Sequence, residues 1–364
     1  MSLLVLKPGI FALPQDGGRR GLMHAGLTQG GPLDLHAWAW ANRLLDNPWG
    51  AGTIEIAYGG LELEAEADLW LSLTGADLDS RIDDEPLAPW QSFLLRRGQR
   101  LRFGHPRTGI TDPSGTDRDS PTGESEGGRP RMGGIRAYLG VAGGLALDGP
   151  TVPREGLGGL HGDGRPLASG DRLPCTPGLA GRPRVVPGHF HPDYSAPLTL
   201  RLIPGSQFGA FSAEARERLF GQSWRLSPRS DRMGARLEGK PIEAPAGLVS
   251  EGIALGAVQV PPDGQPIVLL NDRQTLGGYP RLGAIHPLDL AALAQRLPGT
   301  ALRLRPCALH EAQEEMRNFL RYFQTHAARG CRPSLGGPLR GAAVENGRRE
   351  RLSANPDPFP TNRS

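Results

Sequence analysis

The chain has 364 residues, a formal net charge of +3 at pH 7, and 52 glycines and 35 prolines. This length is enough for two domains, and a glycine and proline content about twice the usual level indicates many turns and short strands rather than a helical bundle. The net charge is small and the basic residues form no clustered run. The chain therefore lacks the charge pattern typical of nucleic-acid-binding proteins.

The clearest strand signal lies at residues 61–75, where leucine and alanine alternate with acidic and other polar residues. This period of two predicts a strand or hairpin with one buried and one solvated face. Further strands are expected at residues 92–104, 136–145, 198–203 and 300–306.

Four helices are expected. The first begins at Pro32 and ends before Pro48, and the second begins after Ser212, which is in N-cap position. The third begins at Pro287, and the fourth covers residues 308–323. Few helices among many short strands predict a β-rich α+β fold.

The composition changes along the chain and predicts its domains. Residues 1–180 are expected to form an N-terminal β-rich domain, residues 181–197 a proline-rich linker and residues 198–328 a second domain. Residues 111–134, within the first domain, have almost no apolar side chains and predict a disordered insertion in a hairpin. The tail at residues 329–364 is expected to be disordered for the same reason.

The sequence NDRQTLGGYP at residues 271–280 concentrates polar groups after an apolar run. The amide of Gln274 and the hydroxyl of Thr275 suit a ligand amide, and the glycines that follow let the backbone approach a ligand closely. The candidate contacts in this segment are Asp272, Gln274, Thr275, Gly277, Gly278 and Tyr279. A hairpin turn at the two glycines is the structural alternative.

A second polar motif, SPRSDRMGARL, surrounds a predicted turn with Arg229, Asp231 and Arg232. A guanidinium offers planar, paired donors that suit a carboxylate or a phosphate, so these three residues are candidate ligand contacts. A surface ion pair between Asp231 and Arg232 is the alternative.

Three further candidates in the first half are Gln15, Asp16 and Arg19. The alternatives for this motif are that it contacts a ligand or that it caps the following turn. Asp34 stands near the start of the first helix, where the helix dipole favours an acidic side chain, and it is interpreted as structural. Glu55 lies on an otherwise apolar strand, so it is either buried and paired or lines a cleft.

Several absences narrow the chemistry. Both lysines, Lys7 and Lys240, precede proline, so neither belongs to a P-loop, and neither lies between methionines as a biotin-carrying lysine would. The three cysteines are far apart and predict neither a disulfide framework nor a metal site, and a reducing cytoplasm is expected. The histidines of HFH at residues 189–191 are interpreted as surface residues. No apolar run reaches the about 18 residues of a membrane helix, and the first residues lack the basic region of a signal peptide.

Motifs in one consistent order occur over about residues 5–305. They include QDGGRRG, GGPLD, RAYLGVAGGL, GRPLASGDRL, SPRSDRMGARLEG and NDRQTLGGYPRLGAI. Together they resemble the family of the 5-oxoprolinase C subunit, which is similar to one half of the carboxyltransferase domain of urea carboxylase. Older names for this family are allophanate hydrolase subunit 2 and biotin-dependent carboxyltransferase.

The resemblance implies two cyclophilin-like β-barrel domains and a role in the ATP-dependent hydrolysis of 5-oxoproline to glutamate, with Mg²⁺ as the counter-ion of ATP. It also implies a homologous B-like subunit as partner and a third, ring-opening subunit, so the chain is expected to be inert alone. The motif residues named above then become candidates for binding substrate or nucleotide. No catalytic group is assigned, and no metal, nucleic-acid or membrane partner is expected.

One family feature is changed here. Relatives have Gly-Ser-x-Ser-Thr where this chain reads DGPTVPREGLGG at residues 148–159, so Thr151 remains and the serines do not. If those serines bind substrate in relatives, the substrate of this chain differs. Two other functions also stay open: carboxyl transfer from biotin on a separate carrier to urea or a similar amide, and a non-enzymatic role as regulatory partner of a homologous subunit.

Overall fold

The computed structural model describes residues 1–106, 133–146, 165–176, 181–245 and 249–324. These residues belong to one compact unit, Met1–Arg329. The predicted disordered tail and residues 111–132 of the predicted insertion lie outside the described residues, and the predicted domain boundaries stay predictions.

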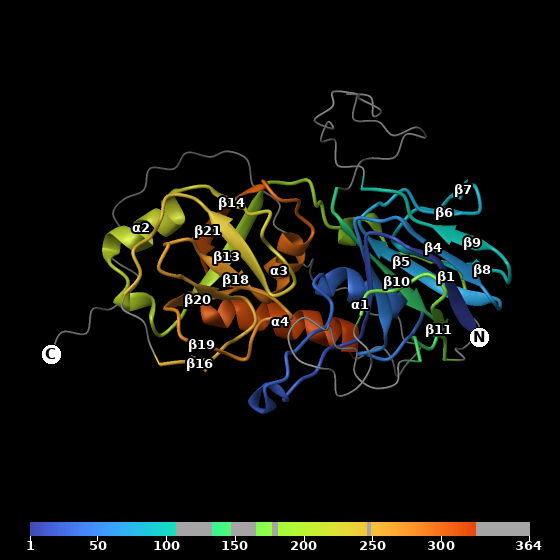
Figure 1. Ribbon diagram of the computed structural model, residues 1–364, viewed down its shortest axis with the longest axis horizontal. Helices are drawn as coiled ribbons and strands as arrows, with labels where there is room; N and C mark the ends of the chain where they lie inside the picture. The colour runs from blue at the N-terminus through green and yellow to red at the C-terminus, as the bar shows by residue number, and fades with distance from the viewer. Residues whose placement is uncertain (107–132, 147–164, 177–180, 246–248, 325–364) are drawn as a thin grey trace, which may run out of the picture. The chain divides into compact units, whose positions relative to one another are not determined.

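The first half of the described chain forms two six-stranded antiparallel sheets (Figure 1). One has the order β11-β1-β4-β9-β6-β7, with bounds Arg172–Pro174, Ser2–Pro8, Leu61–Ala65, Arg100–Arg102, Arg81–Ile82 and Glu85–Pro86. The other has the order β12-β8-β5-β10-β3-β2, with bounds Arg184–Val185, Gln91–Leu95, Leu69–Gly75, Arg136–Val141, Thr53–Ala57 and Phe11–Gln15.

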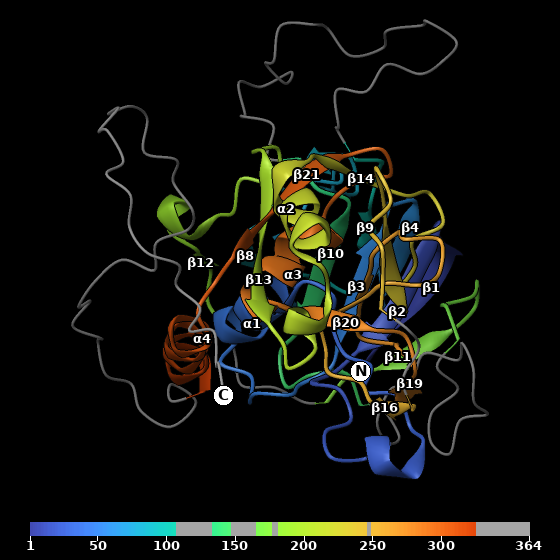
Figure 2. The ribbon, with the colours of Figure 1, turned by 90° about the vertical axis from the view of Figure 1, so that its left-hand side faces the viewer.

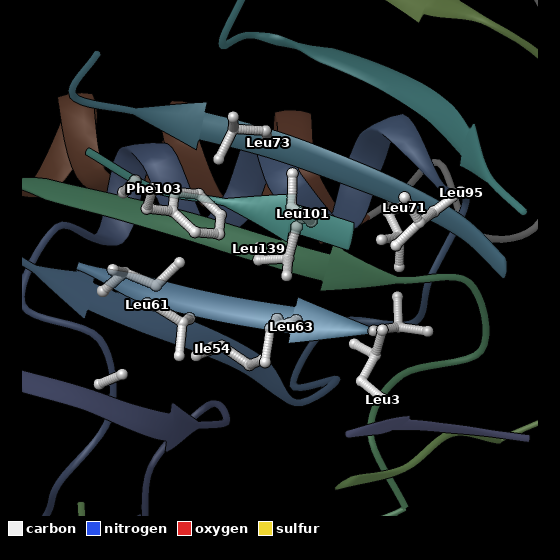
Figure 3. Close-up of a cluster of buried hydrophobic side chains, with 14 of the residues drawn as sticks. Leu3, Ile54, Leu61, Leu63, Leu71, Leu73, Leu95, Leu101, Phe103 and Leu139 are labelled. Atoms are coloured by element: carbon white, nitrogen blue, oxygen red, sulfur yellow. The ribbon is translucent and has the colours of Figure 1, made fainter. Parts of the chain in front are cut away.

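The two sheets share one apolar core (Figure 3). Leu63 of β4 and Leu101 of β9 contribute to it from the first sheet, and Leu71 of β5 and Leu139 of β10 from the second. All four leucines are fully buried. Burying one such side chain contributes roughly 1.5–3 kcal/mol, so this layer is a major source of stability.

The alternating segment at residues 61–75 is neither one strand nor a hairpin, which corrects the prediction. It contains β4, which pairs with β1 and β9, and β5, which pairs with β8 and β10 of the other sheet. Residues 92–104 likewise contribute β8 to one sheet and β9 to the other. Alternation reports which face of a strand is buried, and both sheets bury the face that meets the shared core, so the change of sheet leaves no mark on the pattern.

The second half forms a closed barrel with the order β13-β20-β17-β18-β15-β14-β21 (Figure 2). The bounds are Leu198–Pro204, Arg281–Ile285, Ala257–Gln259, Ile267–Leu269, Gly234–Glu238, Trp224–Leu226 and Ala301–Pro306. A small ribbon pairs β16 (Glu251–Gly252) with β19 (Leu276–Gly277). Inside the barrel, Val258, Val268 and Leu302 belong to a second apolar core.

The described residues form four α-helices: α1 (Leu35–Leu44), α2 (Ala213–Gly221), α3 (Pro287–Ala294) and α4 (Leu309–Gln324). Three short 3-10 turns lie at Met23–Ala25, Gly188–Phe190 and Phe208–Ala210. Ser212 caps α2 as expected, because its Oγ accepts from Ala215 N at 3.1 Å. The expected β-rich α+β class is confirmed, with a closed barrel and few helices.

The predicted linker is packed against the protein over its described residues 181–197. Its strand β12 pairs with β8, and Val186 and Tyr194 are buried in an aromatic cluster with Trp90. His191 stacks on Trp90 at a centroid distance of 5.0 Å, whereas His189 is exposed.

No group of His, Cys, Asp and Glu side chains within the described ranges is arranged to hold a metal ion. None of the helices described for this chain is long and apolar enough to cross a membrane.

Candidate functional site

Arg232 lies in the interior, with 6 % of its surface exposed. Its Nη1 donates to Glu55 Oε1 at 2.5 Å, its Nε to Asp272 Oδ2 at 2.7 Å and its Nη2 to the Gly31 carbonyl at 2.7 Å. Burial alone would lower the Arg232 pKa, but the two carboxylates outweigh it and raise that pKa above its usual value. This candidate is thus held by protein oxygens from three separate segments of the chain.

Glu55, on β3, is also fully buried. Its Oε2 accepts from the Tyr138 hydroxyl at 2.6 Å and from Leu33 N at 3.0 Å. Burial would raise the pKa of Glu55, but Arg232 and Arg136 lower it below its usual range. Of the two alternatives for a carboxylate on this apolar strand, buried and paired is the one observed.

The same network continues to Asp34 at the start of α1. Its Oδ1 accepts from Ala37 N at 2.9 Å, so Asp34 is the N-cap of α1, and its interpretation as a structural residue is confirmed. Its Oδ2 accepts from the Tyr194 hydroxyl and from Gln295 Nε2, each at 2.7 Å. Burial raises the pKa of Asp34 despite these donors.

The three candidates at the end of β2 have local or buried positions. Asp16 Oδ1 accepts from Gly18 N at 2.8 Å, so it caps the following turn. Gln15 is buried, and its Oε1 has no hydrogen-bond partner among the described residues. Arg19 is also buried, its Nη2 lies 3.4 Å from Thr28 Oγ1, and burial lowers its pKa.

The first residues of the NDRQTLGGYP segment explain part of its polarity. Asn271 Nδ2 donates to the carbonyls of Gly30 and Pro32, and Arg273 Nη2 donates to Gln29 Oε1. Burial lowers the pKa of Arg273 to about 10. Together with Arg232, which is paired with Asp272, these side chains bind the barrel to the loop that precedes α1.

The later residues of that segment border open space. Gln274, Gly277, Gly278 and Tyr279 line a cavity of about 870 Å³, named here the larger cavity. Gln274, Tyr279 and Asp231 line a neighbouring cavity of about 510 Å³, the smaller cavity. Both volumes fall in the range of small-molecule sites, so this subset of the candidates forms the candidate binding site.

The remaining second-half candidates have other roles. Thr275 is half-buried, and its carbonyl accepts from Ile253 N at 3.1 Å, which holds the β16–β19 ribbon. Arg229 is exposed, with its Nη2 3.9 Å from Glu238 Oε1. Asp231 Oδ1 accepts from Met233 N at 2.8 Å and so caps its own turn, rather than pairing with Arg232.

The floor of the smaller cavity is the outer face of β15, β17 and β18. Gln259 lines this cavity and its Nε2 lies beside Gly277 of the β16–β19 ribbon, whereas its neighbours Val258 and Val260 belong to the barrel core. Gln259 is absent from the sequence-based candidates. A single glutamine flanked by Val258 and Val260 was the available signal, and it does not distinguish a paired amide from an unpaired one.

Comparison with known proteins identifies the family. The family model of the carboxyltransferase domain, subdomain A and B, matches residues 25–112 and 126–306. The chain therefore belongs to this carboxyltransferase domain family, and the resemblance noted in the sequence is confirmed.

Among curated relatives, the 5-oxoprolinase C subunit of Escherichia coli K12 is 34 % identical over 342 residues, which cover 90 % of this chain and 98 % of that protein. The protein of the same name from Haemophilus influenzae is 31 % identical and is covered to 89 %. The urea amidolyase of Saccharomyces cerevisiae is 24 % identical over 338 residues, but only 17 % of its length is covered.

Two solved structures show related folds. The crystal structure of TTHA0988 superposes with a TM-score of 0.68 at 35 % identity, covering 84 % of this chain and 56 % of that one. The urea carboxylase of Kluyveromyces lactis superposes with a TM-score of 0.76 at 21 % identity, covering 91 % of this chain and 30 % of that one. This chain thus spans about half of the first structure and less than a third of the second, whose likeness shows the fold alone.

Proposed function

We propose that this chain is the C subunit of an ATP-dependent 5-oxoprolinase-type complex, which hydrolyses 5-oxoproline to glutamate. The observation that supports this most directly is the coverage of 98 % of the E. coli 5-oxoprolinase C subunit. Such coverage is expected of a separate subunit of the same kind. The match to 17 % of a fungal urea amidolyase, in contrast, aligns the chain with one part of a much longer polypeptide.

The chemistry of lactam hydrolysis indicates what this subunit contributes. A lactam is a poor electrophile, and phosphorylation of its oxygen by ATP, with Mg²⁺ as counter-ion, makes the ring carbon a better electrophile for attack by water. In this proposal the chain binds and orients substrate or nucleotide in the two cavities through Gln274, Gly277, Gly278 and Tyr279. The ring-opening groups come from another subunit.

The assembly is part of the same proposal. A permanent partner of the B-like type should bury roughly 2,000 Å² or more in total. The exposed apolar side chains of Leu276 and Tyr279, beside the larger cavity, support contact with another protein there. Cys175 and Cys307 are free and buried, which supports a reducing, cytoplasmic location.

The test is reconstitution. The purified chain is assayed for 5-oxoproline-dependent ATP hydrolysis alone, then with a B-like subunit, then with a third subunit. We expect no turnover by the chain alone, a stable complex with the B-like subunit on gel filtration, and turnover when all subunits are present. Substantial turnover by the isolated chain would contradict the dependence on partners.

The family description favours one other candidate, carboxyl transfer. Carboxylation of urea that requires a biotinylated carrier protein, in the same purified system, would support that function instead. ATP hydrolysis that depends on 5-oxoproline and proceeds without biotin would reject it. A chain that binds its partner without either activity would support the regulatory role.

A further inference from the structure

Gln259, at the end of β17, is a buried polar side chain without a partner. Only 1 % of its surface is exposed, and its Nε2 makes no hydrogen bond to any described residue. Buried amides in folded proteins are nearly always hydrogen-bonded, so an unpaired one requires an explanation. Gln259 also lines the smaller cavity, which supplies a place for a partner outside the chain.

The β16–β19 ribbon leaves room for this side chain. A Cβ at Gly277, on β19, would lie 2.8 Å from Gln259 Nε2 and 2.6 Å from Ile253 Cδ1. At Gly252, on the paired strand β16, a Cβ would meet no atom within 4 Å. The ribbon is therefore closely fitted to Gln259 through Gly277 and is open at Gly252.

One positive charge borders the same cavity without a described partner. Arg236, on β15, is exposed, and no described residue bonds to its guanidinium. The two acidic side chains of the cavity, Asp231 and Asp263, accept hydrogen bonds from the backbone N–H groups of their own turns. Arg236 is thus available for an anionic group of a ligand, and its fork of donors suits a carboxylate.

The carboxamide of Gln259 presents a donor and an acceptor side by side. An amide in the cis form has its N–H and C=O on one edge and matches this arrangement with two hydrogen bonds. A lactam ring enforces the cis form, and urea offers the same edge, whereas an open-chain amide is almost always trans.

We propose that Gln259 binds the cis-amide edge of a small lactam or urea-type substrate in the smaller cavity, and that Arg236 binds the carboxylate of a substrate that carries one. The identification of this substrate as 5-oxoproline rests on the function proposed above. The cis-amide edge is shared by 5-oxoproline and urea, and Arg236 discriminates between them.

The experiment measures binding of four probes to the full-length chain, alone and with the B-like subunit, by calorimetry or ligand-observed NMR. The probes are 5-oxoproline, pyrrolidin-2-one, urea and N-methylacetamide. We expect 5-oxoproline to bind most tightly, pyrrolidin-2-one and urea more weakly, and N-methylacetamide not detectably. Preferential binding of N-methylacetamide, or binding of none of the probes, would overturn the proposal.

Variants assign the contacts. Gln259→Met should weaken all three cis-amide probes by about tenfold or more, the effect of losing both hydrogen bonds of the amide in a buried site. Arg236→Gln should weaken 5-oxoproline to a similar degree and leave pyrrolidin-2-one and urea unchanged. Gln91→Met, in the first-half sheets, is the matched control and should bind like the parent chain. Parent-like binding by Gln259→Met would overturn the assignment.

Two glycine variants test the same contact sterically. Gly277→Ala should displace the Gln259 amide and reduce binding of the cis-amide probes by about tenfold or more, whereas Gly252→Ala should leave binding unchanged. Equal binding by the two variants would count against the proposed geometry.

Melting temperatures distinguish loss of a ligand contact from loss of the fold. Because Gln259 is unpaired in the protein, Gln259→Met should melt at the parent temperature or above it. A reconstituted complex that hydrolyses 5-oxoproline equally well with Gln259→Met would refute this inference and leave the proposed function standing. Gln259-dependent lactam binding in a complex that does not hydrolyse 5-oxoproline would support this inference and contradict the proposed function.

Discussion

Gln295 and Gln259 are each only 1 % exposed, yet their surroundings differ completely. Gln295 Oε1 accepts from the backbone N–H groups of Ile135 and Arg136, and its Nε2 donates to Asp34 and to the Arg136 carbonyl. Gln259 makes no side-chain hydrogen bond to a described residue and borders a cavity. Burial alone therefore does not separate a structural residue from a binding residue.

The two regions around these glutamines differ in the same way: polar groups are paired in one and unpaired in the other. The network of Arg232, Glu55 and Asp34 uses its polar atoms to join loop, sheet and barrel segments that are far apart in the chain. The smaller cavity keeps polar atoms of Gln259 and Arg236 unused by the described residues. Paired groups hold the fold together, and unpaired groups beside a cavity are where a ligand should bind.

The largest expected effect is on the paired region. Arg232→Met leaves Glu55 and Asp272 as buried carboxylates without their arginine, so the free energy of unfolding should fall by about 3–5 kcal/mol. Denaturant unfolding measures this, with Arg229→Met as the control, because that exposed arginine is 3.9 Å from a single carboxylate and should change stability little. Equal losses in both variants would remove the distinction between the two arginines.

The glutamine pair itself offers the next test. Gln295→Met orphans two backbone N–H groups and should lower the free energy of unfolding by about 2–4 kcal/mol. Gln259→Met removes an unpaired amide and should leave that free energy unchanged or raise it by up to about 1 kcal/mol. Thermal and denaturant unfolding of both variants decide the matter, and a comparable loss in Gln259→Met would mean that its amide is paired after all.

A smaller effect is expected from pH. The pKa of Glu55 is lower in the folded protein than its ordinary value of 4.5, so its ionised form adds stability above that value. This contribution is lost as pH falls through the folded-state pKa, since protonation then breaks the pair with Arg232. Unfolding measured from pH 6 downward should therefore show a flatter acid limb for Glu55→Gln than for the parent chain.

Asp34→Asn is the matched control for that profile. The pKa of Asp34 is raised by burial, so its ionised form costs stability at higher pH and its protonation restores stability as pH falls. Its replacement should steepen the acid limb where that of Glu55 flattens it. Slopes that change in the same direction would contradict the assigned signs.

The smallest effect should come from a segment outside both regions. Deletion of residues 115–131, which offer almost no apolar side chains, should change neither the melting temperature nor ligand binding. A loss of several degrees, seen by calorimetry, would show that this segment contributes to the core.

Much of the fold could be predicted because its signals are local. The alternation at residues 61–75 predicts strands, and the helix starts at Ser212 and Pro287 follow from capping chemistry within a few residues, whereas the first helix begins at Leu35 and not at Pro32. The change of sheet between β4 and β5 could not be predicted, since both strands bury the same core face. The order of motifs along the chain was sufficient to recognise the carboxyltransferase domain family.

By itself, the sequence determined the β-rich class, the presence of the four helices and the family. Only the tertiary structure decided which polar residues are paired. Arg232 meets Glu55 across 177 positions, so no local pattern distinguishes this buried pair from a ligand site or a surface ion pair. The unpaired state of the Gln259 amide could not be predicted either, because whether a buried amide has a hydrogen-bond partner depends on which distant segments pack around it.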